Sequence, residues 1–183
     1  MGKIRPVKQV KLFAGIIASG EAALLAAEKE VETTLGKISL RSEIIPFDHT
    51  EYYKAEMGEG LLRRWVGFEK TRFPSDLAPA KVAANAIEAK FAENGGGRTG
   101  RCVNIDPGYV ELAKVVLAST KDFGHRIYIG EGIYAELTLI YYKGEGYKGL
   151  PWTYPDYQSE EGGKFLLALR NQLKDEIDKS LPK

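Results

Sequence analysis

Two hydrophobic periodicities follow one another near the start of the chain, and their order constrains the fold more than any other feature. Val10–Ala18 is a run of apolar and β-branched residues, which predicts a buried strand. Apolar residues then recur at helical spacing from Leu24 to Leu35. Ser19 is the expected N-cap of this helix, and Gly36 supplies its C-terminal stop.

The same periodicities continue along the chain and predict the remaining elements. Further strands are expected at 38–45, 62–72, 101–106, 115–118, 126–129 and 133–142, and helices from about Pro79 to Phe91 and from about Ser159 onward. The order strand, helix, strand, strand, helix, strand is that of a ferredoxin-like core. The sequence therefore predicts an α+β fold, with a ferredoxin-like βαββαβ core extended by antiparallel strands and a C-terminal helix. Residues 1–183 are expected to form a single domain, because no repeat or domain boundary is evident.

Composition and charge exclude several classes of protein. With 183 residues, 44% of them hydrophobic and 28% charged, the chain is typical of an ordinary globular protein. A net charge of +1 gives no indication of a nucleic-acid or anionic-membrane partner. No apolar run approaches the roughly 20 residues of a membrane span. One cysteine, Cys102, cannot form an internal disulfide, so a reducing, cytoplasmic location is expected.

Most residues that could carry chemistry lie in four polar segments, each of which follows a predicted strand or core helix. The segments are Phe47–Tyr53, Asn104–Tyr109, Ser119–Arg126 and Trp152–Tyr157. Together they contain both histidines of the chain and several carboxylates. Loops that a rigid scaffold positions are common places for binding and catalytic residues. The sequence therefore predicts that a ligand site is formed where these segments meet.

A predicted hairpin gives Arg126 a specific partner. If Gly130–Gly132 forms the loop, the register pairs Ile129 with Ile133, Tyr128 with Tyr134 and Arg126 with Glu136. The pair of Arg126 and Glu136 either covers the sheet or holds the guanidinium ready to bind a phosphate or carboxylate. His125 is expected on the opposite face of the strand from Arg126, unless the strand begins after both residues.

Candidate catalytic and metal-binding residues fall in the first three segments. His49, Asp106 and His125 are candidates for acid–base catalysis, since histidine titrates near neutral pH. Asp48, Glu56 and Asp106 could supply oxygen ligands to an ion of the Mg²⁺ type. His49 could equally be a turn residue beside a short helix. One cysteine and two distant histidines match no usual zinc pattern.

The ligand-binding candidates have structural alternatives. They are Asn104, Thr120, Lys121, Arg126, Glu136, Trp152, Tyr154 and Asp156. The loop Ser119–Asp122 either holds an anion or is a plain connection, and Asp106–Tyr109 is a good turn sequence. The aromatic residues of 152–157 form either a stacking wall or a lid on the core. Lys81, Asn85 and Glu88 share one helix face, which is interpreted as a solvated face.

Several longer segments resemble a bacterial family, the domain of unknown function numbered four-four-one-six, whose members are often labelled "GTP-binding protein". The similar segments are Val10–Gly15, Tyr52–Gly58, Asn104–Tyr109, Leu117–Asp122, His125–Tyr128, Gly132–Glu136 and Pro151–Tyr157. The resemblance implies no catalytic residues. The chain lacks a phosphate-binding Gly-x-x-x-x-Gly-Lys-Ser/Thr loop. In addition, Phe123 stands where an Asn/Thr-Lys-x-Asp motif would place its aspartate, so the sequence does not support a GTPase of the P-loop type.

Three hypotheses follow from the sequence. The first is that the four segments form a pocket for a phosphorylated or otherwise anionic small ligand, a nucleotide among the candidates. The second is a non-catalytic module that binds a protein or RNA partner. The third is that the polar residues mainly satisfy one another and fix the fold. No reaction is assigned from the sequence.

Overall fold

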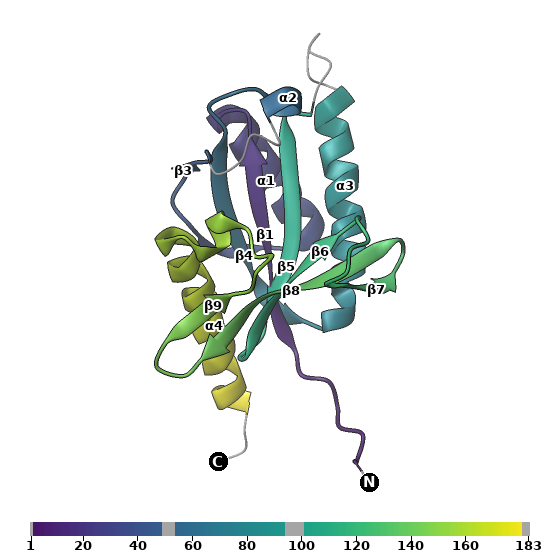
Figure 1. The fold of residues 1–183 in the computed structure, drawn as a ribbon, viewed down its shortest axis with the longest axis vertical. Coiled ribbons are helices and arrows are strands. Elements are labelled where there is room, and N and C mark those ends of the chain that lie inside the picture. Colours follow the sequence, from purple (N-terminus) through teal and green to yellow (C-terminus); the bar gives the residue numbers. More distant parts are fainter. Residues whose placement is uncertain (1, 49–53, 94–100, 181–183) are drawn as a thin grey trace.

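The computed structural model describes residues 2–48, 54–93 and 101–180, and Figure 1 labels its elements. The strands are β1 (Val10–Ala18), β2 (Ile38–Arg41), β3 (Ile45–Pro46), β4 (Leu62–Arg72), β5 (Val103–Val110), β6 (Lys114–Ser119), β7 (Arg126–Gly130), β8 (Ile133–Tyr142) and β9 (Gly146–Gly149). The helices are α1 (Glu21–Leu35), α2 (Lys54–Met57), α3 (Leu77–Glu93) and α4 (Glu160–Ser180), with short 3-10 turns η1 (Pro74–Asp76) and η2 (Pro155–Gln158).

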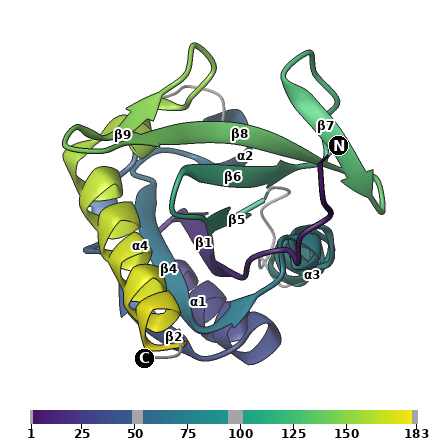
Figure 2. The same ribbon diagram turned by 90° about the horizontal axis from the view of Figure 1, so that it is seen from below.

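One large sheet organises the described residues. Its order is β2-β4-β1-β5-β6-β8-β7, with β3 beside β4 and β9 beside β8, and its strand pairs are antiparallel. Helices α1 and α3 lie against one face and α4 against the other, as Figures 1 and 2 show. The prediction of a mixed α and β fold with an antiparallel sheet and a C-terminal helix is confirmed.

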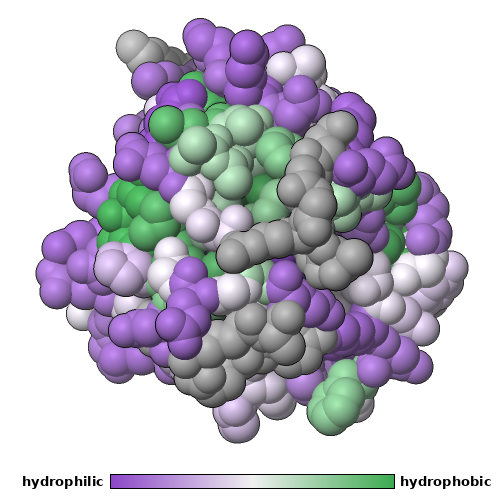
Figure 3. Space-filling model, turned by 90° about the horizontal axis from the view of Figure 1, so that it is seen from above, coloured by the Kyte–Doolittle hydropathy of each residue, from purple (hydrophilic) through white to green (hydrophobic). Residues whose placement is uncertain are grey.

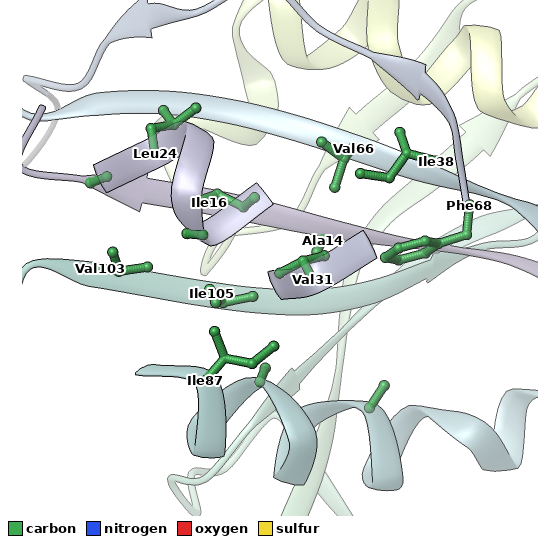
Figure 4. Packing of buried hydrophobic residues seen from close by; sticks show 14 of the residues in the cluster. Ala14, Ile16, Leu24, Val31, Ile38, Val66, Phe68, Ile87, Val103 and Ile105 are labelled. Carbon is green, nitrogen blue, oxygen red and sulfur yellow. The ribbon is translucent and has the colours of Figure 1, made fainter. Parts of the chain in front are cut away.

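The core follows from the alternation of β1, whose side chains point to opposite faces of the sheet. Ala14 and Ile16 face α1 and α3, where they pack with Val66 and Ile87 (Figure 4). Phe13 faces the other way, toward α4. Both faces of the central strands are therefore covered, which explains why β1 contains so few polar residues.

Helix α4 covers the second face with the predicted leucine stripe. Leu166, Leu169 and Leu173 are fully buried. The hydroxyl of Ser159 accepts a hydrogen bond from the Gly162 amide at 3.1 Å, which confirms the predicted start of the helix. Gly67 on β4 leaves room for this packing, because a Cβ there would lie 2.7 Å from Leu169.

The sheet opens on one side of β5. This strand pairs with β1 along its whole length, but it pairs with β6 only at Gly108–Val110. Figure 2 shows the strong bend by which β6 and β8 turn away from β5 and β1. From Val103 to Pro107, β5 therefore presents an edge without a strand partner, and the candidate site lies beside this edge.

The structure corrects the predicted turn at Asp106–Tyr109. Strand β5 continues through these residues to Val110. Proline is tolerated in strands mainly where ladder bonds are missing, and β6 pairs with β5 only beyond Pro107. Gly108 is required by close packing rather than by a turn, since a Cβ there would lie 2.6 Å from the ring of Phe13.

Other predicted boundaries also differ. Helix α1 begins at Glu21 with Gly20 as its N-cap and no side-chain capping bond, so the predicted cap at Ser19 is wrong, whereas Gly36 ends the helix as expected. The strand expected at 38–45 is divided into β2 and β3, both of which pair with β4.

The β7–β8 hairpin has most of the predicted register. Arg126 pairs with Glu136 and Tyr128 with Tyr134, as predicted. Ile133, however, pairs with Gly130 rather than Ile129, because a bulge shortens the loop to Glu131 and Gly132. Both loop residues have positive φ, 55° and 75°, as a two-residue turn between twisted strands requires. Among the described helices, none is both long and apolar enough to cross a membrane.

Candidate functional site

A pocket of about 360 Å³ lies beside the open edge of β5. Its walls come from the face of β1, β4 and β5 opposite α1, from one side of α3, from the β6–β7–β8 region, and from α2 and η2. The lining residues are Ile17, Phe47, Glu56, Arg63, Lys81, Asn85, Glu88, Arg101, Asn104, Asp106, Leu117, Ser119, Thr120, Lys121, Arg126, Glu136, Tyr154, Asp156 and Tyr157. Figure 3 shows this end of the molecule from above, with hydrophilic residues around its rim and hydrophobic and intermediate residues nearer its middle.

Arg126 is held in the pocket wall by a buried carboxylate. Its Nε donates to Glu136 Oε2 at 2.9 Å, and its Nη1 donates to the carbonyl oxygen of Lys121 at 3.2 Å. The Glu136 side chain is 3% exposed, and the hydroxyl of Thr138 donates to its other oxygen at 3.5 Å. A guanidinium carries five N–H donors, so most of the donors of Arg126 are not used by these two contacts.

His125 lies behind Glu136 rather than in the pocket wall. Its Nε2 is 3.0 Å from the same Glu136 oxygen that Arg126 contacts. Because strand β7 begins at Arg126, His125 precedes the strand and is free to lie on the same side. Its ring stacks on Trp152 with centroids 4.7 Å apart and an angle of 8° between the planes. His125 therefore positions Glu136 and joins the two loops.

Trp152 anchors this stack to β8, since its indole nitrogen donates to the carbonyl oxygen of Leu137 at 2.8 Å. Trp152 does not line the pocket, whereas Tyr154, which is 51% exposed, does. Of the two aromatic candidates for stacking, Tyr154 lines the pocket, whereas Trp152 stacks on His125.

Arg63 forms the floor of the pocket. Its side chain is 1% exposed, and Nη2 lies 2.9 Å from Asp156 Oδ2. The guanidinium carbon is 4.7 Å from the centre of the Trp65 ring and 5.1 Å from that of Tyr157. Gly15 leaves the space for this group, because a Cβ there would lie 2.7 Å from Nη2.

Charged residues of α3 bind the unpaired edge of β5. The ammonium of Lys81 donates to the carbonyl oxygen of Ile105 at 2.7 Å, and Glu88 accepts from the Ile105 amide at 2.7 Å. Two side chains thus satisfy backbone groups that a neighbouring strand would otherwise satisfy. Arg101 joins Glu88 to Asn104. The predicted solvated face of α3 is therefore wrong for Lys81 and Glu88, which are both buried.

Asp106 extends this network into the pocket. Lys81 lies 3.2 Å from its Oδ1, and the Asn104 amide nitrogen donates to its Oδ2 at 2.6 Å. Burial opposes ionisation, but the charges of Lys81 and Arg63 and the two hydrogen bonds outweigh it. They lower the pKa of Asp106 below its ordinary value, so this carboxylate is ionised at neutral pH.

The pKa values of two other groups in the pocket wall, Glu88 and Tyr157, are raised instead of lowered. Burial raises the pKa of Glu88, although Lys81 and Arg101 act against it. Burial also raises the pKa of the Tyr157 phenol well above its ordinary value, so Tyr157 is protonated at neutral pH. Of the two carboxyl groups, Asp106 is therefore more readily ionised than Glu88.

Comparison with known proteins places the chain in a family. The profile of a family described as "Domain of unknown function (DUF4416)" matches residues 8–173, which include every strand, β1 to β9. The chain belongs to the DUF4416 family. Searches of curated proteins and of solved structures found no match.

The DUF4416 chain brings most of its predicted site residues to one pocket. Those that line it are Glu56, Asn104, Asp106, Thr120, Lys121, Arg126, Glu136, Tyr154 and Asp156. Asp48, His125 and Trp152 do not line it, and His49 lies outside the described residues.

The predicted magnesium ligands are not brought together as a set. Asp106 and Glu56 both line the pocket, while Asp48 does not. In the described part of the chain, no group of three His, Cys, Asp or Glu side chains is arranged to hold a metal ion. The pocket wall of the DUF4416 chain contains several ion pairs, among them Arg63 with Asp156, Lys81 with Asp106 and Arg126 with Glu136.

Sequence reasoning missed the pocket residues Arg63 and Arg101 and misinterpreted Lys81 and Glu88. Arg63 and Trp65 are two residues apart on β4 and therefore lie on the same face of the sheet. Nothing in the sequence, however, gave a reason to expect a buried cation there. Lys81, Asn85 and Glu88 had a usable signal, because polar residues at this spacing on an otherwise alanine-rich helix mark one continuous side.

Proposed function

We propose that the pocket binds a small ligand with one anionic group, either a phosphate or a carboxylate. The observation that carries the proposal is the geometry of Arg126, which is fixed from behind by Glu136 and lines the pocket in front. Guanidinium groups bind such anions through two parallel N–H donors. Thr120 and Lys121 lie on the same wall and supply a hydroxyl and an ammonium.

The size and composition of the pocket support a small-molecule ligand. Its volume of about 360 Å³ lies at the lower end of the range of about 300 to 1,000 Å³ that is typical of ligand sites. Several charged side chains in the wall are nearly inaccessible, among them Arg63, Lys81 and Glu136. Burying charges is costly unless they are paired, and such clusters in a cleft are typical of functional sites.

Charge balance argues against a polyanion such as a nucleoside triphosphate. Among the described residues, the pocket is lined by five cationic side chains, Arg63, Lys81, Arg101, Lys121 and Arg126, and by five carboxylates, Glu56, Glu88, Asp106, Glu136 and Asp156. Ion pairs within 4 Å join Arg63 to Asp156, Lys81 to Asp106, Arg101 to Glu88 and Arg126 to Glu136. A ligand with several negative charges would face as many anions as cations, so a single anionic group fits better.

A thermal-shift panel tests this proposal. Nucleotides, sugar phosphates and small carboxylates are screened with and without Mg²⁺ against the wild type, Arg126→Ala and the control Lys143→Ala. Lys143 is exposed and does not line the pocket. We expect at least one singly phosphorylated or carboxylated compound to raise the melting temperature of the wild type and the control, and to act much more weakly on Arg126→Ala. No stabilisation by any compound would reject the proposal.

A different observation favours the second candidate function, an interaction module. Strand β7 ends the sheet, and its Ile127 and Tyr128 are 73% and 60% exposed. Apolar edge strands of this kind are typical of surfaces that pair with another chain. In that case Ile127→Lys would abolish binding of a partner, while the small-molecule panel would give no stabilisation.

The arrangement of β1-α1-β2-β4-α3-β5 supports a finer fold assignment, and we propose that it is the ferredoxin-like core. Its strands have the spatial order β2-β4-β1-β5 with antiparallel neighbours, and both helices cover one face. The pocket then lies on the opposite face of this core, the face against which α4 also packs. An experimental structure in which β2 did not lie beside β4 would contradict this assignment.

A further inference from the structure

Asp106 is a carboxylate of the pocket wall that is both held in place by hydrogen bonds and accessible. Its side chain is 29% exposed, against 3% for Glu136 and 5% for Asp156. Each of its oxygens accepts one hydrogen bond from inside the protein, from Lys81 and from Asn104. A carboxylate can accept about four hydrogen bonds, so about two acceptor positions are left on the pocket side.

Asn85 provides a second open group on the same wall. It lies one helical turn after Lys81 on α3, lines the pocket and is half-buried. Within the described residues, the carboxamide of Asn85 makes no hydrogen bond, whereas the amide of nearby Asn104 is bound on both sides by Arg101 and Asp106. A carboxamide can both donate and accept, so Asn85 is able to bind either a donor or an acceptor of a molecule in the pocket.

The chemistry of the Asp106 carboxylate and the Asn85 carboxamide indicates which kind of ligand group would bind them. Asp106 can only accept hydrogen bonds when ionised, so its partner must donate. Its charge is already balanced by Lys81, at 3.2 Å, and by the nearby Arg63. A neutral hydroxyl therefore fits this position better than an ammonium group, which would bring an unbalanced positive charge beside two cations.

We infer that Asp106 and Asn85 form a hydroxyl-binding subsite, and that the ligand is a phosphorylated sugar or polyol. Its anionic group lies on Arg126, Thr120 and Lys121, and its hydroxyl groups lie on the β5 and α3 wall. This inference rests on the proposed function, because it assigns the second end of the same ligand.

Two probes that differ in their hydroxyl groups test the inference. Ribose 5-phosphate and n-pentyl phosphate each carry one phosphate monoester and have similar lengths, but pentyl phosphate has no hydroxyls. Calorimetric titration of the wild type should give at least about tenfold tighter binding of ribose 5-phosphate, the factor expected from one hydrogen bond to a charged acceptor. Asp106→Asn should reduce this preference to less than about threefold, while its affinity for pentyl phosphate stays similar.

The outcomes separate the two proposals. Equal affinity of the wild type for both phosphates would overturn the hydroxyl subsite and leave the anion site intact, provided that Arg126→Ala weakens both. Binding of neither phosphate would also overturn the hydroxyl subsite for a phosphorylated ligand, and the proposed function would then be decided by the small carboxylates of the thermal-shift panel. The comparison of probes on the wild type needs no variant, so an unstable Asp106→Asn would not prevent the test. Asn85→Ala and the exposed control Glu93→Ala provide a second pair, of which only Asn85→Ala should lower the preference.

Discussion

At the scale of single residues, the site depends on the absence of a side chain at Gly15 as well as on the side chains that surround this residue. The Arg63 guanidinium and the Tyr157 hydroxyl occupy the space where a Cβ of residue 15 would lie, at 2.7 Å and 2.9 Å. The sequence around Gly15 does not indicate that glycine is required there, because the side chains that need the space come from β4 and η2. A buried arginine without a sequence motif is for this reason hard to predict from the chain alone.

Gly15→Ala is expected to destabilise the protein. The added methyl group must displace a guanidinium that is buried and paired with Asp156, and overpacking of this kind costs about 1 to 3 kcal/mol. Urea denaturation would measure the change. Gly124→Ala is the matched control, since a Cβ at Gly124 meets nothing within 4 Å. Equal stabilities for the two variants would contradict the description of the pocket floor.

The depressed pKa of Asp106 predicts a pH dependence of stability. Because the folded-state pKa lies below the unfolded value of about 3.9, ionised Asp106 stabilises the fold above that pH. The contribution is lost as the pH falls through the lower folded-state pKa. Denaturation of the wild type and Asp106→Asn should show a constant difference between pH 7 and about pH 5, and a smaller one below about pH 4. A difference that grows on acidification would contradict the assigned direction.

At the scale of elements, the strands and long helices were predictable because their hydrophobic periods are regular. Strands β1 and β4 have the predicted bounds, and the pairing of Arg126 with Glu136 followed from the hairpin. The failures have local causes. Pro107 and Gly108 suggested a turn, but they lie within β5, at the point where its pairing with β6 begins. Lys81 and Glu88 suggested solvent, but they bind that strand's open edge.

The contact between α3 and the open edge of β5 leads to a prediction for Glu88. In Glu88→Ala the Ile105 amide loses its acceptor, so its hydrogen exchange should accelerate and the protein should lose about 1 to 3 kcal/mol. Glu93→Ala, on an exposed part of the same helix, is the control. Unchanged exchange at Ile105 in Glu88→Ala would show that α3 does not take the place of a strand there.

At the scale of the whole molecule, the pocket exists because the sheet divides between β5 and β6. The sequence indicated which polar segments are involved, and nine of the predicted site residues line the pocket. It could not indicate the division itself, since that depends on long-range pairing of β5 with β1 and of β6 with β8. For the same reason it could not place His125 and Trp152 behind the wall rather than in it.

The pocket is proposed to bind a phosphorylated sugar or polyol, with its anionic group at Arg126. Titration of ¹⁵N-labelled protein with ribose 5-phosphate tests this central claim most directly. We expect the largest chemical-shift changes at the amides of Ser119–Lys121, at the Arg126 Nε–H and at the Asn85 side-chain amide, and their loss in Arg126→Ala. Changes confined to exposed lysines of α4, such as Lys174 and Lys179, or no changes at saturating ligand, would contradict the claim.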